Sequence, residues 1–402
     1  MIPRRASFSE PSKYWLGVAS ELVAPVLRAV AAMRSGRECT PPGAWRRGLI
    51  VSHNHIGDLL YRTPSLPALR AALPDCEWHY LAAPGAAEVL EGNPHLAAVL
   101  PLGRGDASWR LEQRGFAALR AMRFDVALCT NNRAHYPDFA LAAALGVPNR
   151  VGFTYKGLSG LINHPVPIDY PSPIPAYFRA MVAAVGGVAP TWDLRPQLFP
   201  TSADRAEAVG AWDELALGTA APVVAAVLTT RQREHVWPAE HYLGALRLVR
   251  ERTGASVVLC GAASDSALLH AVARAAPFPC GVLAGRLSLR AFGEFLRRCS
   301  ALLSTDSGPR HIANAVGTPV VFIRNLWTSS VEAGSYCDTD IDATPDHELV
   351  PIPRQLEILR AITPERVAGL VLRAMAPTGN APGAGAARAA ERPLAHGGVG
   401  ER

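Results

Sequence analysis

The chain has 402 residues, of which 49% are hydrophobic and 18% charged, and this globular composition excludes a protein that is disordered throughout. One hydrophobic core rarely serves a chain of this length, so we expect two domains with a cleft between them. The formal net charge is +6, but the basic residues are scattered rather than gathered into runs. The charge pattern therefore gives no support for a nucleic-acid partner.

The cysteines exclude two further classes of protein. There are seven of them, an odd number, and none forms a C-x-x-C pair, so neither a disulfide framework nor a zinc site is indicated. The start of the chain does not show a charged segment followed by an apolar run and a small-residue cleavage site, as a signal peptide would. We therefore expect a cytoplasmic protein.

The first predicted element is one amphipathic helix over residues 11–33. Six apolar residues recur there at helical spacing: Trp15, Val18, Leu22, Val26, Val30 and Met33. Charged and proline residues inside the segment argue against a membrane span. We expect the helix to pack on the protein's own body; the alternative is contact with a membrane interface through Tyr14 and Trp15, which adjoin Lys13.

A first series of short apolar runs then predicts buried parallel strands with helices between them. These runs are residues 48–52, 78–82, 97–101, 125–129 and 150–153. Because strands alternate with helical stretches, the sequence predicts an α/β domain.

A second series repeats this organisation at residues 223–228, 256–260, 281–284, 301–304 and 319–323. Proline-rich loops at residues 164–175 and 195–200 separate the two series. We therefore predict an N-terminal extension over residues 1–45, a first domain over 46–195 and a second over 196–376. Residues 377–402 are rich in Gly, Ala, Pro and Arg without an apolar period, which predicts a disordered tail.

The most informative segment, residues 304–321, joins a predicted strand to a predicted helix. Asp306 or Ser307 can cap this helix, and Gly308 lets a ligand approach backbone N–H groups that suit phosphate oxygens. His311 falls on the first helical turn and faces the same opening. The alternative interpretation is a well-capped turn with a surface histidine and no ligand.

Residues 49–66 form the corresponding strand, turn and helix of the first series. Gly57 permits a tight backbone path, and Asp58 follows at the carboxyl end of the strand, where open α/β sheets present their ligands. The alternative role of Asp58 is to stabilise the helix N-terminus through the helix dipole. The two roles are compatible.

These segments resemble glycosyltransferase family 9, the heptosyltransferases. Residues 306–321 fill every fixed position of the family pattern D-(S/T)-G-x-x-H-x-A-x-A-x-G-x-P-x-V. Residues 49–66 are similar to the family's strand, I/M-G-D turn and T-P-x-L helix. Residues 228–242 resemble its donor loop, K-x-W-P-x-E-x-W/F, but the lysine is missing, and after residue 323 the usual F-G-P-T-D-P continuation is replaced.

The resemblance implies roles for particular residues. Asp58 is expected to be the general base that deprotonates the acceptor hydroxyl. The expected donor-binding residues are Thr229, Thr230, Arg231, Arg233, Asp265, Asp306, Ser307, Gly308 and His311. Among these, Arg231 and Arg233 are candidate replacements for the lysine, and Asp265 is the candidate for the ribose hydroxyls. The candidate acceptor-binding residues are His55, Asn132, Arg133 and His135.

The resemblance also implies the α/β GT-B architecture, with two Rossmann-like domains facing a central cleft. The implied reaction is an inverting transfer without metal or cofactor, from a nucleotide-sugar donor that is expected to be ADP-heptose. The expected acceptor is a glycan or glycolipid such as the lipopolysaccharide core, which would bring the protein to the cytoplasmic face of the inner membrane. No D-x-D-like pair stands near the donor segments to hold a divalent ion.

Two other functions stay open. A nucleotide-sugar epimerase of the same fold would share the donor lobe, and a protein that binds a nucleotide sugar without turnover would fit the missing lysine. An NAD-dependent dehydrogenase is disfavoured, because no G-x-G-x-x-G motif follows the first strand.

Overall fold

The structure of the protein is a computed structural model. It describes residues 11–52, 55–101, 113–130, 136–154, 157, 159–168, 172–186, 194–230, 236–326, 329–345 and 352–376. The predicted tail at residues 377–402 lies outside the described residues.

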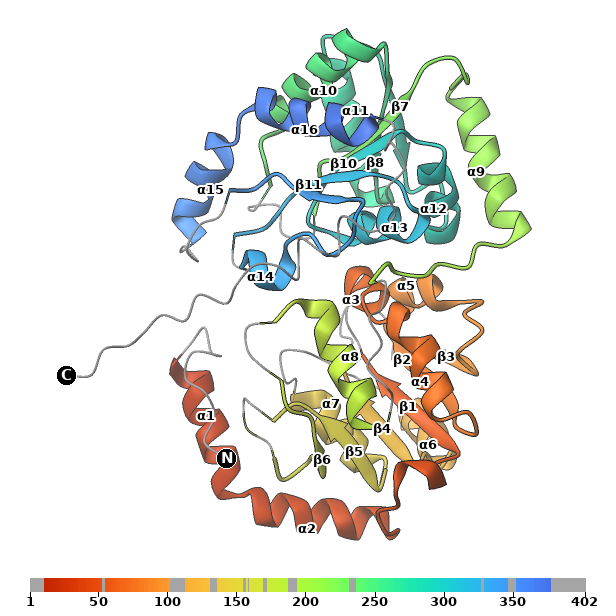
Figure 1. The fold of residues 1–402 in the computed structure, drawn as a ribbon, viewed down its shortest axis with the longest axis vertical. Helices are drawn as coiled ribbons and strands as arrows, with labels where there is room; N and C mark the ends of the chain where they lie inside the picture. Colours follow the sequence, from red (N-terminus) through yellow and green to blue (C-terminus); the bar gives the residue numbers. More distant parts are fainter. Residues whose placement is uncertain are drawn as a thin grey trace, which may run out of the picture.

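The N-terminal extension forms two helices, α1 (Pro11–Leu22) and α2 (Ala24–Ser35), which meet at Val23. The prediction of one continuous helix over residues 11–33 was therefore wrong. Pro25 explains the break, because proline lacks the N–H that would continue the hydrogen bonding of α1. Figure 1 shows α1 and α2 running in different directions along the outside of the first lobe.

The first lobe contains a six-stranded sheet in the order β3-β2-β1-β4-β5-β6, and every pair of neighbouring strands is parallel. Its strands are β1 (Arg47–Val51), β2 (Glu77–Ala82), β3 (Ala98–Pro101), β4 (Val126–Cys129), β5 (Asn149–Gly152) and β6 (His164–Pro165). Its helices are α3 (Ile56–Leu60), α4 (Leu66–Ala72), α5 (Pro84–Ala87), α6 (Gln113–Ala121), α7 (Tyr136–Ala144) and α8 (Ile174–Ala184). Because helices cover the sheet, β1 and β4 are buried apolar runs rather than alternating ones.

The second lobe repeats this plan in the order β12-β11-β10-β7-β8-β9, again with parallel neighbours. Its strands are β7 (Val223–Val227), β8 (Ser256–Gly261), β9 (Cys280–Ala284), β10 (Ala301–Thr305), β11 (Val320–Ile323) and β12 (Asp340–Asp342). Its helices are α9 (Ser202–Glu214), α10 (Ala239–Thr253), α11 (Ser266–Ala275), α12 (Leu289–Arg297), α13 (Gly308–Val316), α14 (Ser330–Ala333), α15 (Ile352–Ala361) and α16 (Pro364–Met375).

All ten predicted strands are present within a residue or two of their expected bounds. The sequence did not predict β6 and β12, which have two and three residues at the outer edges of the sheets and are too short to show a hydrophobic pattern. The domain limits at residues 45, 195 and 376 stay predictions.

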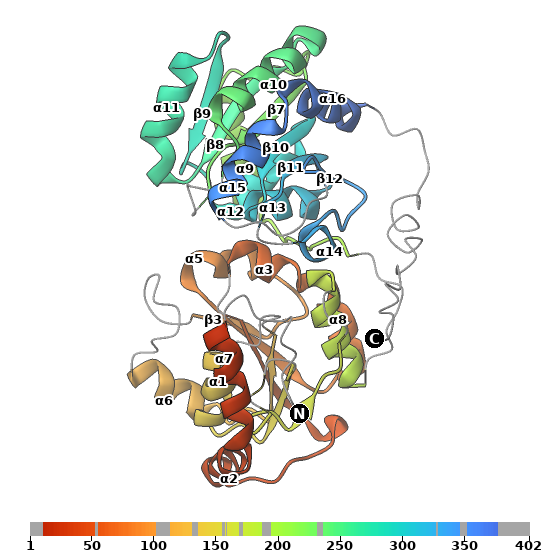
Figure 2. The same cartoon turned by 90° about the vertical axis from the view of Figure 1, so that its left-hand side faces the viewer.

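The lobes lie one above the other, with α3 of the first lobe next to α13 of the second (Figures 1 and 2). An apolar cluster continues from one lobe into the other through residues such as Leu59 and Ile312. Beside it, the Arg290 guanidinium of α12 pairs with Glu91 of the first lobe at 3.1 Å. Among the described residues no helix is both long and apolar enough to cross a membrane.

Candidate active site

Asp58 lies in the first turn of α3, the helix that follows β1 in the chain. Its Oδ2 accepts a hydrogen bond from the backbone N–H of His55 at 3.3 Å, so the carboxylate does cap the helix start. The Asp58 side chain is half-buried, and His55 is exposed beside it. The structure thus confirms that Asp58 lies at the helix N-terminus, and its role as a base stays a prediction.

Gly57 touches the second lobe. A Cβ atom on this residue would lie 2.4 Å from Cδ2 of His311, far inside normal contact distance. Gly57 is not among the glycines with positive φ, so the close approach rather than a left-handed backbone conformation requires a glycine here. The absence of a side chain instead lets the His311 ring pack directly against α3.

Gly308 makes the reciprocal contact. A Cβ atom there would lie 3.0 Å from Cβ of Ile56, the first residue of α3. The two glycine-containing motifs of the sequence, residues 49–66 and 304–321, therefore meet face to face across the lobes. The approach of a ligand to Gly308 stays a prediction.

His311 is buried within an aromatic cluster rather than exposed, with 4% of its surface accessible. Its Nδ1 is 2.8 Å from the hydroxyl of Tyr336, and its ring centroid lies 4.4 Å from that of Tyr61. Burial, reinforced by the neighbouring Arg310 charge, lowers the pKa of His311 well below its usual value. His311 therefore does not face an opening as expected, and the alternative of a surface histidine is wrong too. Its donor-binding role stays a prediction.

Arg310, which the sequence analysis passed over, organises the start of α13. The guanidinium is fully buried and uses each of its nitrogens. It donates to Asp340 at 3.1 and 2.5 Å and to Asp306 at 2.8 Å. It also donates to the backbone carbonyl oxygens of residues 333 and 334, in the turn that leads to Tyr336.

Asp306 consequently does not cap α13. Its second oxygen accepts from Asn325 at 3.1 Å, and Ser307 occupies the N-cap position without a side-chain capping bond. Burial raises the pKa of Asp306, and the neighbouring Arg310 charge opposes that rise. Asn325 lies in the segment after β11 that departs from the family pattern. In this chain the altered segment thus supplies a hydrogen-bond donor to the Asp306 carboxylate.

The remaining donor-side candidates gather at the carboxyl ends of β7, β8 and β10. The Thr229 hydroxyl donates to Asp265 Oδ2 at 2.9 Å, and the Thr305 hydroxyl lies 3.2 Å from the Thr229 carbonyl oxygen and 2.9 Å from the Ser307 hydroxyl. The structure thus brings Thr229, Asp265 and Ser307 together at one edge of the sheet. Thr230 follows in the same loop and is half-buried.

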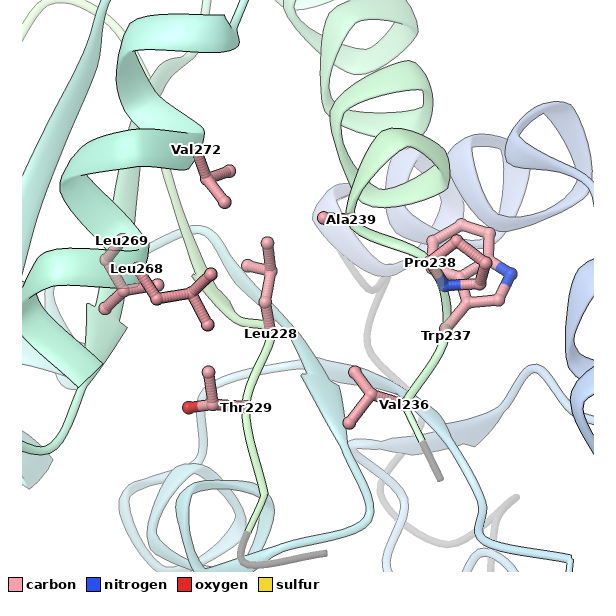
Figure 3. Close-up of a pocket in the computed structure, with 9 residues that line it drawn as sticks. All are labelled: Leu228, Thr229, Val236, Trp237, Pro238, Ala239, Leu268, Leu269 and Val272. Atoms are coloured by element: carbon pink, nitrogen blue, oxygen red, sulfur yellow. The ribbon is translucent and has the colours of Figure 1, made fainter. Parts of the chain in front are cut away.

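An apolar cavity of about 200 Å³ adjoins Thr229. Figure 3 shows Leu268, Leu269 and Val272 of α11 on one side and the segment from Val236 to Ala239 on the other. Thr229 contributes the one polar side chain of this lining. The cavity continues the edge on which Thr229 and Asp265 lie.

Five candidates lie outside the described residues: Arg231, Arg233, Asn132, Arg133 and His135. Their expected roles stay predictions. Within the part of the chain that the structure describes, no three His, Cys, Asp or Glu side chains are grouped as metal ligands would be.

Sequence reasoning missed Arg310, Tyr61, Tyr336 and Asp340. Arg310 stands at a variable position of the signature, and its burial beside His311 and Asn314 in α13 leaves no signal in the sequence. Tyr336 lies in a turn, and Asp340 lies in the edge strand β12. Both contact α13, but a contact between segments far apart in the sequence leaves no local sequence pattern.

Two parallel α/β lobes with strand-end loops meeting between them define the GT-B architecture. The family model "Glycosyltransferase family 9 (heptosyltransferase)" matches residues 113–325. The chain belongs to glycosyltransferase family 9 and is a glycosyltransferase.

Among its relatives, lipopolysaccharide heptosyltransferase 2 of Escherichia coli is 25% identical over 334 residues, covering 78% of this chain and 88% of that protein. Lipooligosaccharide heptosyltransferase 2 of Haemophilus influenzae is 26% identical over 293 residues, covering 68% and 81%. A solved family 9 glycosyltransferase from Veillonella parvula aligns with a TM-score of 0.70 at 18% identity, over 82% of this chain and 97% of that one. The solved E. coli ADP-heptose heptosyltransferase II aligns with a TM-score of 0.63 at 20% identity, over 82% and 98%.

The first prediction concerns the contact between the lobes. Gly57→Ala should destabilise the protein by about 1–3 kcal/mol, because the new methyl group overlaps the His311 ring. Urea unfolding measures the change. Gly85→Ala is the matched control in the same lobe, since a Cβ there meets nothing within 4 Å. Equal stability of the two variants would contradict the close packing.

The second prediction concerns the buried ion pair. Asp340→Asn should cost about 3–5 kcal/mol of unfolding free energy, because it leaves the Arg310 charge buried and partly uncompensated. Glu251→Gln breaks an exposed pair with Arg247 and should cost at most about 1 kcal/mol. Denaturant unfolding of both variants checks this, and similar losses would refute the organising role of Arg310.

The third prediction concerns pH. Because the pKa of His311 is lowered in the folded state, unfolded chains take up a proton below about pH 6.5 that folded chains do not. Stability should therefore fall between about pH 7.5 and about pH 5.5, by up to about 1.4 kcal/mol per unit below the unfolded pKa. The urea midpoint of the wild type should fall more steeply than that of His311→Gln. Parallel pH profiles would show that His311 titrates normally.

Proposed function

We propose that the protein transfers heptose from ADP-heptose to a sugar of the lipopolysaccharide core, with inversion and without a metal or cofactor. Its relatives carry the names lipopolysaccharide and lipooligosaccharide heptosyltransferase 2, and one aligned structure is described as an ADP-heptose transferase. The proposal places the reaction in the cytoplasm, with the acceptor at the cytoplasmic face of the inner membrane.

One observation carries this proposal: the helix that bears Asp58 packs against the helix that bears His311. The contact between Gly57 and His311 brings the proposed base of the first lobe next to the proposed donor-binding residues of the second. A transferase needs this arrangement, because base, acceptor hydroxyl and anomeric carbon must align within one step. An epimerase acting on the donor alone would not need an acceptor base.

The donor binds the second lobe in this proposal. Thr229, Thr230 and Ser307 face the phosphates, and Asp265 accepts from a ribose hydroxyl, with Thr229 already bonded to it. The first turn of α13 offers backbone N–H groups and the positive end of the helix dipole to the departing ADP. Arg231 and Arg233 replace the cation that the family's donor-loop lysine would supply.

The acceptor binds the first lobe, near His55 and the predicted residues Asn132, Arg133 and His135. Asp58 removes the proton from the acceptor hydroxyl, whose oxygen attacks the anomeric carbon as the bond to ADP breaks. A single displacement of this kind inverts the anomeric configuration. Backbone dipoles and arginine side chains stabilise the leaving charge in place of a metal ion.

The fourth prediction tests the base. Asp58→Asn should lower kcat for heptose transfer by about 10²–10⁴-fold, because the amide cannot accept the proton, while donor affinity is kept. Asp75→Asn, which alters an exposed carboxylate of the same lobe, is the control and should leave both unchanged. Transfer is measured by mass spectrometry of the acceptor, with ADP-heptose binding measured in parallel.

Unchanged kcat in Asp58→Asn would refute its role as the base. A heptose product that is altered but still attached to ADP would favour the epimerase instead. Donor binding by the wild type with neither transfer nor hydrolysis would favour a binding protein without turnover.

A further inference from the structure

The exposed large apolar side chains of the protein are concentrated on its N-terminal extension. Ten such side chains are exposed in the described part of the chain, and six belong to α1, α2 and the residue between them. These six are Trp15, Leu22, Val23, Val26, Val30 and Met33, which we call the outer apolar face. The exposed fractions of Leu22 and Met33 reach 81% and 74%. A soluble surface rarely carries so dense a group without a partner.

The opposite side of the same helices is fixed to the first lobe. A Cβ atom on Gly160 would lie 2.4 Å from the carbonyl oxygen of Ala24, and one on Gly157 would lie 2.7 Å from that of Gly17. Ala31 is 1% exposed, and the Glu21 carboxylate accepts from both the backbone and the hydroxyl of Ser159. The prediction that the extension packs on the body is thus confirmed for this side, and it leaves the outer apolar face turned away from the lobe.

The charged side chains of α2 are all basic. α2 carries Arg28 and Arg34 and no acidic residue, and Glu21 of α1 is bonded inward to Ser159. Beyond α2, Arg37 pairs with Asp125 of the lobe at 3.1 Å, and Glu38 is exposed. Arg28 and Arg34 are exposed. Apolar and aromatic side chains bordered by arginines match the interface of a bilayer that contains anionic lipid, where the rings and aliphatic groups enter and the cations meet phosphate.

The shape of the extension favours a membrane surface over the other occupants. Each helix has 12 residues, about 18 Å of length, which is too short to cross a bilayer. Leu22, Val23 and Val26 stand at the bend between the helices, at the end of the first lobe farthest from the second (Figures 1 and 2).

We infer that the corner formed by α1 and α2 docks on the surface of an anionic bilayer and holds the first lobe against it, with the part of the outer apolar face around the bend inserted. This inference concerns where the protein binds and does not depend on the identity of its sugar substrates. The sequence predicted such a membrane contact as an alternative, through Tyr14 and Trp15. In this inference the contact is made by the outer apolar face and by Arg28 and Arg34.

Flotation of the full-length protein with lipid vesicles tests the inference. The wild type should float with vesicles of phosphatidylethanolamine and phosphatidylglycerol, and less with phosphatidylcholine alone. Leu22→Ser combined with Val26→Ser should lower the partition by about tenfold or more, because two inserted apolar side chains are lost. Val209→Ser combined with Leu356→Ser removes apolar side chains that are 45% and 39% exposed on other helices and should bind as the wild type does.

A charge variant and an oligomer measurement complete the design. Arg28→Glu combined with Arg34→Glu should weaken binding to the anionic vesicles and leave the small binding to phosphatidylcholine unchanged. Wild-type protein that does not float, or equal flotation of the Leu22/Val26 variant, would overturn the inference. It would also be overturned if the wild type formed dimers by ultracentrifugation that the Leu22/Val26 variant lost, without lipid binding in either protein.

Discussion

The His311 ring packs directly on the backbone of Gly57, and much of the site depends on that contact. A methyl group on Gly57 would overlap the ring at 2.4 Å, so the two helix starts approach this closely only because residue 57 has no side chain. Tyr61 and Tyr336 enclose the same imidazole, and Tyr336 belongs to the turn whose carbonyl groups Arg310 holds. The Asp58 carboxylate therefore has a fixed place relative to the donor helix, which is what a one-step transfer requires.

The buried charge of Arg310, next to this contact, is compensated by its partners. Arg310 is fully buried, but every guanidinium nitrogen has an acceptor, and two carboxylates share its charge. Burying the Arg310 charge costs desolvation free energy, which offsets much of its attraction to the two carboxylates. The main effect of these hydrogen bonds is therefore to fix the geometry of the helix start rather than to add stability. Arg310 thus joins Asp306 of the family signature to the turn that reaches the first lobe, although its own position in the signature is variable.

Most of the fold could be predicted from the sequence, because buried parallel strands leave continuous apolar runs such as residues 48–52 and 301–304. The motif residues could be predicted from their place at strand ends. Contacts between distant segments could not: nothing local shows that Tyr336 meets His311 or that a glycine serves as a packing surface for a histidine 254 positions later. Pro25 could have predicted the break of the N-terminal helix at Val23. The apolar residues keep helical spacing on both sides of the break, however, and this pattern led to the prediction of one helix.

In the proposed mechanism the second lobe, which bears His311, binds the donor. The first lobe, which bears Asp58, binds and deprotonates the acceptor. Calorimetric titration of ADP, UDP and GDP into the wild type, Asp58→Ala and His311→Ala tests that division most directly. The account predicts selective ADP binding that Asp58→Ala keeps and His311→Ala weakens. Preference for UDP or GDP, or an equal loss of ADP binding in both variants, would contradict it.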